Sequence, residues 1–200
     1  MNYIGLDLGQ RMDHSAMVIV EREGYAPWLG RAGGPLVVRY AERAPLGTPY
    51  PEVVEWVRRI AGRQEISGRC ALAVDATGVG APVVDMLRRA QVGCEISAVT
   101  ITGGEREHQT GGLWHVPKTD LMAGVKVALE SGELRIAKGL PEVGTLVREL
   151  VDVQVTLRAG GGARIGADGA GEHDDLVIGL ALAVWRGKRR ENGLRSERLF

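Results

Sequence analysis

Short apolar runs separated by polar loops fill the first part of the chain. Runs of this length, bounded by turn-forming residues, are typical of strands. The three runs cover residues 2–8, 15–22 and 36–42. Because the loops that join them are short, they favour an antiparallel meander.

From residue 49 the pattern changes to an alternation of helices and strands. Apolar residues at helical spacing predict a helix over 49–63, with Thr48 as its N-cap. A strand, a helix and a second strand then follow with short links, and this order predicts a parallel pair joined by a right-handed crossover. These three elements are expected at 70–75, 81–91 and 94–101.

The second half of the chain predicts helices around one more strand. The polar, Gly-rich stretch 102–112 predicts a mobile loop. Helices are expected at 118–130, 139–150 and 172–185, a strand at 151–157, and a Gly-rich hairpin tip or loop after it. The predicted fold class is α/β, with a mixed sheet (an antiparallel meander plus parallel strands) flanked by helices. We expect one domain over 1–186 and a basic, flexible tail over 187–200.

Composition narrows the class of protein. A chain of 200 residues with 44% hydrophobic and 25% charged residues is typical of one ordinary globular domain. The formal net charge of zero argues against a protein that holds nucleic acid by overall basicity, although a local basic patch is compatible with it. The longest apolar run, 176–185, is too short to span a bilayer, so we expect no membrane association.

The cysteines and the N-terminus indicate the cellular compartment in which the protein is expected. Cys70 and Cys94 are far apart and form no Cys-x-x-Cys pair, which predicts neither a structural zinc site nor a disulfide. No basic leader precedes the first apolar run. Both observations predict a reducing, cytoplasmic location, which is the host cytoplasm if the protein is encoded by a virus or prophage.

Acidic residues stand where ligand chemistry is common in α/β proteins. Asp7 and Asp75 each end an apolar strand and open into a Gly-containing loop. In open α/β sheets, ligands bind beyond the carboxyl ends of the strands. Asp174 and Asp175 open the last predicted helix. If the first two strands are parallel neighbours, we expect these carboxylates to converge at one edge of the sheet.

Such a cluster needs a cation or protons. Two carboxylates 4 Å apart repel by roughly 4 kcal/mol at an effective dielectric near 20. Hard oxygen ligands favour Mg²⁺ or Mn²⁺, and a pair of such ions is the usual device for hydrolysis of a phosphodiester. The alternative for each position alone is structural, since an Asp after a strand is often a turn residue and Asp-Asp at a helix start is often a cap.

Four segments resemble the nuclease domain of bacteriophage large terminases, and they occur in the order found in that family. They are GLDLGQRMDHSAMVIV (5–20), AVDATGVGAPVVDML (73–87), WHVPKTDLMAGVKVALESGELRI (114–136) and GEHDDLVIGLALAVW (171–185). The resemblance implies a ribonuclease-H-like fold, dependence on Mg²⁺ or Mn²⁺, and cutting of concatemeric viral DNA during genome packaging. The partners it implies are double-stranded DNA and other packaging proteins, namely a small terminase subunit, a portal and an ATPase domain.

The resemblance assigns metal ligands position by position. Asp7 and Asp75 match two metal-binding acids of the family, and Asp175 matches the third. These three are the expected catalytic residues. Asp174 lies beside the third acid, and whether it shares the role is left open.

Three further residues are auxiliary candidates. Asp13 stands where the family has a second acid in the first motif, and a loop residue that caps a turn is an equal alternative. Lys118 matches a family lysine that opens a helix and could touch phosphate. His173 adjoins the acidic pair and could orient a carboxylate or a water, while a helix-capping or exposed histidine is the simpler reading.

The chain also departs from a full terminase. It contains no G-x-x-x-x-G-K-[ST] sequence, so we expect no ATP hydrolysis by a P-loop, and whether it is an excised domain or a free-standing relative is left open. Three other functions are compatible with the sequence. The GLDLG sequence is shared with actin-like kinases, a Holliday-junction resolvase could use the same fold, and a packaging module could have lost its catalysis.

Overall fold

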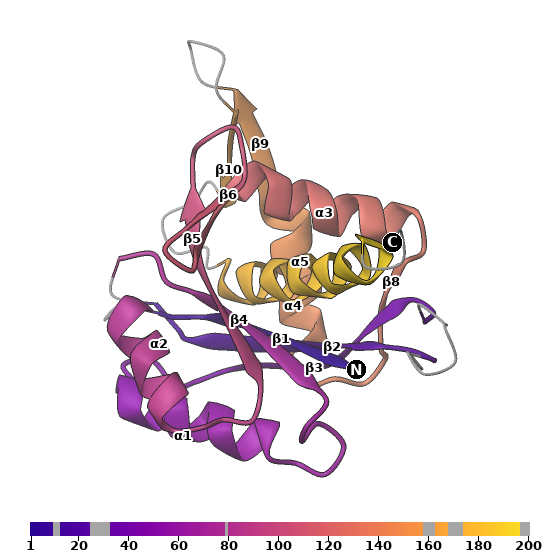
Figure 1. Ribbon diagram of the computed structural model, residues 1–200. Helices are drawn as coiled ribbons and strands as arrows, with labels where there is room; N and C mark the ends of the chain where they lie inside the picture. The colour runs from indigo at the N-terminus through magenta and orange to yellow at the C-terminus, as the bar shows by residue number, and fades with distance from the viewer. Residues whose placement is uncertain (10–12, 25–32, 79, 158–162, 168–173, 197–200) are drawn as a thin grey trace.

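A mixed sheet forms the middle layer of the molecule, with helices on both faces (Figure 1). The computed structural model describes residues 1–9, 13–24, 33–78, 80–157, 163–167 and 174–196. Within these residues the sheet has eight strands in the order β6-β7-β5-β4-β1-β2-β3-β8. The predicted α/β class with a mixed sheet is therefore confirmed.

The antiparallel meander comes from the first three strands. They are β1 (Asn2–Asp7), β2 (Ala16–Arg22) and β3 (Leu36–Arg43), and each pairs antiparallel with the next. β1 is buried along almost its whole length because helices cover both faces of the sheet at its centre. This explains why β1 reads as a continuous apolar run rather than as an alternating one.

The predicted parallel pair follows. α1 (Tyr50–Ala61) leads into β4 (Cys70–Asp75), and α2 (Gly80–Arg89) connects β4 to β5 (Glu95–Thr102). β4 is parallel to β5 on one side and to β1 on the other. The carboxyl ends of three neighbouring strands therefore meet at one edge of the sheet.

The remaining elements complete the sheet and its second helical layer. In chain order they are β6 (His108–Thr110), β7 (Leu113–Pro117), α3 (Lys118–Glu130), β8 (Leu134–Ile136), α4 (Val143–Asp152), β9 (Val153–Leu157), β10 (Ala163–Ala167) and α5 (Asp175–Ser196). β9 and β10 form a separate antiparallel pair.

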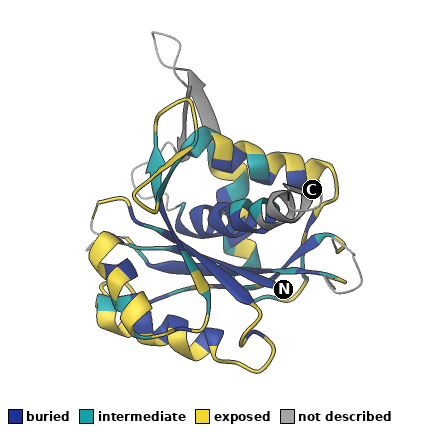
Figure 2. Ribbon diagram, viewed as in Figure 1, coloured by how far each residue is buried: buried dark blue, intermediate teal, exposed yellow. Residues whose placement is uncertain are grey.

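Two hydrophobic cores lie on the two faces of the sheet. α1 and α2 cover one face, while α3, α4 and α5 cover the other. The first half of α5 is buried on all sides, whereas α1 and α2 present an exposed outer face (Figure 2). A helix that is apolar all round is a central helix, and α5 lies directly across β1 and β2.

Two local expectations are wrong. The stretch 102–112 is not a single loop, because β6 and β7 form a hairpin at the edge of the sheet. β6 is fully exposed, so it lacks the apolar run that reveals a strand. Thr48 does not cap α1: Pro49 is the N-cap, and the Thr48 hydroxyl bonds the Pro45 carbonyl instead.

The basic tail also differs from the expectation. α5 does not end at Trp185 but continues to Ser196. Its basic side chains find acidic partners on other elements: Arg186 pairs with Glu95 at 2.6 Å, and Arg189 pairs with Glu107. The division into a domain and a tail stays a prediction, with the correction that residues 187–196 are helical.

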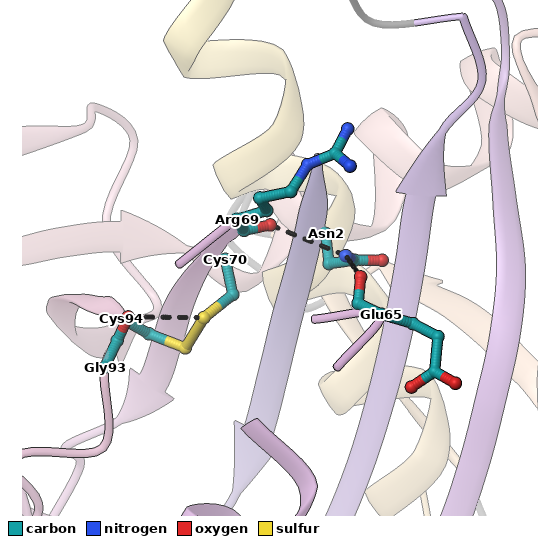
Figure 3. Close-up of a disulfide and its surroundings, with 6 residues drawn as sticks. All are labelled: Asn2, Glu65, Arg69, Cys70, Gly93 and Cys94. Carbon is teal, nitrogen blue, oxygen red and sulfur yellow. Dashed lines mark hydrogen bonds between the residues drawn. A yellow bond between two sulfur atoms is a disulfide. The ribbon is translucent and has the colours of Figure 1, made fainter. Parts of the chain in front are cut away.

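The absence of a disulfide is a further expectation that is wrong. Cys70 at the start of β4 and Cys94 just before β5 are joined by a disulfide (Figure 3). Their separation along the chain gave no sign of it, but β4 and β5 are parallel neighbours, and the two Cα atoms lie 5.0 Å apart. The cysteines therefore no longer support the predicted reducing compartment, and the cytoplasmic location stays a prediction.

None of the helices in the described part of the chain combines the length and the apolar character of a membrane-spanning segment.

Candidate metal centre

Asp7 and Asp75 lie side by side at the ends of neighbouring parallel strands. β1 and β4 run in register with Leu6 opposite Val74, so the aspartates that follow emerge at the same edge. Together with Asp174 and Asp175 they line one pocket of about 370 Å³. The structure thus brings the four acidic residues selected from the sequence to a single place.

A close contact between backbones brings α5 to this edge. Gly5 in the middle of β1 faces Gly179 in the first turns of α5, and a Cβ atom at Gly5 would lie 1.8 Å from the Gly179 carbonyl oxygen. Only glycine permits this approach, because any side chain would overlap the helix backbone. The contact holds the start of α5, and with it Asp175, over the carboxyl end of β1.

The loop after β4 orients Asp75. Its Oδ1 accepts a hydrogen bond from the backbone N–H of Thr77 at 2.8 Å, which forms a turn closed by the aspartate itself. The Thr77 hydroxyl in turn accepts the backbone N–H of Ile101 at 2.9 Å. The end of β4 is therefore tied to β5, and the Asp75 carboxylate is fixed at the pocket.

The electrostatics of the pocket oppose ionisation of its acids. Burial raises the pKa of Asp7 well above its usual value, and the charges of Asp75, Asp175 and Asp174 raise it further, while Lys118 lowers it. Burial also raises the pKa of Asp75, against the bonds from Thr77 and the charge of Lys118. The pocket thus concentrates more negative charge than its own cations balance, which is the condition for binding an added cation.

Two cationic side chains face the aspartates at the start of α5. Lys118 Nζ bonds Asp174 Oδ2 at 2.7 Å, and Arg43 Nε lies 3.7 Å from Asp175 Oδ2. Among the described residues, no three His, Cys, Asp or Glu side chains are grouped closely enough to hold an ion as they stand. The carboxylates of Asp174 and Asp175 instead face cationic side chains of the protein.

A larger hollow of about 560 Å³ lies between α3 and α4. Its lining is mainly apolar, including Met122, Leu129 and Leu150, and it contains no group of acids. The candidate metal centre is therefore chosen by the convergence of carboxylates and not by the size of the pocket.

Solved structures of phage terminase nucleases share this architecture. The nuclease of thermophilic phage G20c with bound magnesium aligns with a TM-score of 0.66 at 20% identity, over 93% of this chain and 81% of that chain. The nuclease domain from phage Sf6 aligns at 0.63 and 16% identity, over 92% and 87%. The domain from phage SPP1 with bound manganese aligns at 0.56 and 13% identity, over 92% and 85%. The chain has the fold of a large terminase nuclease domain. No family model matches the sequence, and no curated protein matches it either.

The terminase nuclease fold confirms the resemblance drawn from the four motifs. It covers more than nine-tenths of the chain. At these identities the likeness establishes the fold, so the roles of individual residues stay predictions.

Two of the three auxiliary candidates lie at the acidic pocket. Lys118 and Asp13 both line the acidic pocket, and Asp13 is exposed. His173 lies outside the described residues. Lys118 begins α3 directly after β7, so its side chain reaches the same edge of the sheet as Asp75.

Sequence reasoning missed two residues behind the pocket. Glu149 of α4 is 6% exposed, and it pairs with Arg43 at the end of β3. Burial raises the pKa of Glu149 to about 7, although Arg43 and the Val177 amide lower it. One signal was present: Glu149 lies three residues after the core residue Leu146, on the apolar face of its helix. No local pattern marked Arg43.

Proposed function

We propose that this chain is a metal-dependent DNA endonuclease of the kind found in phage large terminases. The observation that carries the proposal is the convergence of Asp7, Asp75, Asp174 and Asp175 on one pocket at the carboxyl edge of the sheet. Structures with the same fold contain bound magnesium in phage G20c and bound manganese in phage SPP1. The sequence resemblance to this family points the same way.

The donor set fits a hard divalent cation. The pocket offers carboxylate oxygens, and its charges raise the pKa of Asp7. Oxygen ligands of this type favour Mg²⁺ or Mn²⁺ over softer metals. Asp7, Asp75 and Asp175 would hold the ions, and Asp174 would share the role of Asp175.

One protein contact must change when an ion binds. Asp174 is bonded to Lys118, so an ion competes with this lysine for the carboxylate. Arg43 Nε faces Asp175 Oδ2 from 3.7 Å, which is beyond hydrogen-bond distance, so this contact need not break. Lys118 released from Asp174 would be free to contact a phosphate of the substrate, since a lysine ammonium is a flexible point charge. Asp75, held by Thr77, stays in place.

The reaction needs no nucleophile from the protein. Bound divalent ions supply an activated water and stabilise the charge that develops on the phosphodiester. The residues of the chain would hold the ions and orient the substrate, with the carboxylates fixed by the strand ends and by α5. We propose two ions, double-stranded DNA as the substrate, cleavage without sequence specificity, and targeting by other packaging proteins, because the neutral net charge gives little autonomous affinity for DNA.

Nicking of a supercoiled plasmid tests this function. We expect cleavage with Mn²⁺, none with chelator, and a loss of about 100-fold or more in Asp75→Asn, because removal of a first ligand exceeds the 10–100-fold cost typical of outer-shell partners. Asp85→Asn is the matched control, since Asp85 is exposed on α2 and pairs only with Arg88 in the described ion pairs.

The outcomes separate the alternatives. Equal activity of wild type and Asp75→Asn would contradict the assignment of the site. Cleavage confined to four-way junctions would indicate a resolvase. A protein that neither binds Mn²⁺ nor nicks DNA would be a non-catalytic packaging module, and ATP binding would indicate a kinase fragment.

A further inference from the structure

The start of α5 is capped in an unusual way. Asp174 is the residue before the helix, and its carbonyl accepts the first helical hydrogen bond, from Ile178 N–H at 2.9 Å. An aspartate in this position normally turns its carboxylate back onto the N–H of the second or third helical residue. Such a bond would direct the carboxylate away from the pocket.

In this structure a residue from another helix caps α5. The N–H of Val177, the third helical residue, donates to Glu149 Oε2 at 3.1 Å. Glu149 lies on α4, 28 residues earlier in the chain. The Asp174 carboxylate bonds Lys118 at the pocket. The usual acceptor role of the residue before the helix has therefore passed to Glu149.

The second oxygen of Glu149 engages Arg43. Arg43 Nη2 donates to Glu149 Oε1, and Arg43 Nε lies 3.7 Å from Asp175 Oδ2. Arg43 therefore stands between Glu149 and Asp175. Glu149 and Asp175 are 6% and 5% exposed, so the group is enclosed behind the pocket.

Stability alone does not explain this arrangement. Removing charges from water is costly, and a buried ion pair can often be replaced by apolar side chains of similar volume without loss of stability. Glu149 and Arg43 nevertheless both constrain the first turn of α5. Glu149 fixes the backbone at Val177, and Arg43 faces the carboxylate of Asp175.

We propose that Glu149 and Arg43 are positioning residues of the acidic pocket. Glu149 caps α5 in place of Asp174, and Arg43, held by Glu149, fixes the Asp175 carboxylate, so that both aspartates remain available to a divalent ion. The inference rests on the proposed function, and it adds two residues that do not line the pocket.

A double variant tests the inference. Removing only one partner would leave a buried charge alone and could prevent folding, so we replace both in Arg43→Met/Glu149→Leu. This change leaves the net charge behind Asp175 unaltered, and a change in metal affinity then reports geometry. The control is Arg58→Met/Glu55→Leu, which removes an exposed pair on α1.

Three readouts are needed. Calorimetric titration with Mn²⁺ is expected to show 10–100-fold weaker binding in the double variant, about the effect of losing outer-shell partners, and unchanged binding in the control. Hydrogen exchange of the Val177 amide is expected to become faster while thermal unfolding stays cooperative. Arg43→Met/Glu149→Gln, which keeps an acceptor for Val177 without leaving a buried charge alone, should restore slow hydrogen exchange of the Val177 amide.

The results distinguish the two proposals. Equal Mn²⁺ affinity of wild type and double variant would overturn the positioning role alone. Unchanged exchange at Val177 would overturn the cap. A wild-type protein without affinity for Mn²⁺ would overturn the proposed function, and the positioning role with it.

Discussion

Asp7 is the residue at which the proposed function and stability conflict most clearly. It ends a buried strand, and burial together with three neighbouring carboxylates raises its pKa. Functional sites often hold groups that the fold alone would not favour, and their removal can stabilise a protein. The sequence identified Asp7 and Asp75 because a strand end is a local pattern. It did not identify Arg43 and Glu149, because they are paired across 106 residues of chain.

We expect Asp7→Asn to stabilise the metal-free protein. The pKa of Asp7 is higher in the folded chain than in the unfolded one, so the folded state binds the proton more tightly, and stability falls as pH rises from the unfolded pKa through the folded pKa. The neutral amide avoids this cost. Thermal unfolding at neutral pH with chelator should show a gain of about 1 kcal/mol, or roughly 2–4 °C.

The same variant should lose the stabilisation by metal. A ligand that binds only the folded state raises the melting temperature, so wild type should melt higher with Mn²⁺ and Asp7→Asn should not. If Asp7→Asn melts at a lower temperature than wild type in chelator, the Asp7 carboxylate stabilises the metal-free protein, and this prediction is wrong.

At the scale of elements, the contact between β1 and α5 places the site. The strands with long apolar runs and the helices with clear periodicity were predicted close to their observed bounds. β6, β7 and β8 were missed because they are short, and most of their residues are not buried. The close approach of Gly5 and Gly179 could not be predicted either, since a glycine in a strand does not reveal which element it meets.

Alanine substitutions at the two glycines should differ sharply. Gly5→Ala places a methyl group inside the backbone of α5, so we expect a loss of about 3 kcal/mol or more, or no folding. Gly179→Ala is the matched control. Its Cβ would lie 3.4 Å from the nearest atoms, and alanine favours the helix, so stability should change by no more than about 1 kcal/mol.

Urea unfolding measures both variants. If Gly5→Ala unfolds cooperatively with a free energy of unfolding within about 1 kcal/mol of wild type, β1 and α5 can move apart with little loss of stability, which would contradict this prediction.

At the scale of the whole molecule, the disulfide and the proposed metal centre lie at opposite ends of β4. The disulfide joins the first residue of β4 to the chain before β5, whereas Asp75 ends β4 at the acidic pocket. The fold class was predictable because the order of elements restricts it. The disulfide was not, because it depends on which strands become neighbours.

Reduction of the disulfide should lower stability and spare activity. The bridge closes a loop of 24 residues, for which chain entropy predicts about 3 kcal/mol. Chemical unfolding with and without a thiol reductant measures the loss, and plasmid nicking below the melting temperature should be unchanged. The control is Cys70→Ser/Cys94→Ser, whose unfolding should not respond to reductant. A wild-type protein that is equally insensitive would contradict the cross-link.

Whether the acidic pocket binds divalent cations is tested most directly by locating the ion. We expect crystals grown or soaked with Mn²⁺ to show anomalous scattering between Asp7, Asp75 and Asp175, with metal–oxygen distances near 2.2 Å and no such peak in Asp75→Asn. Anomalous peaks confined to other surfaces, or a wild-type pocket without a peak at millimolar Mn²⁺, would contradict the metal centre and the nuclease function built on it.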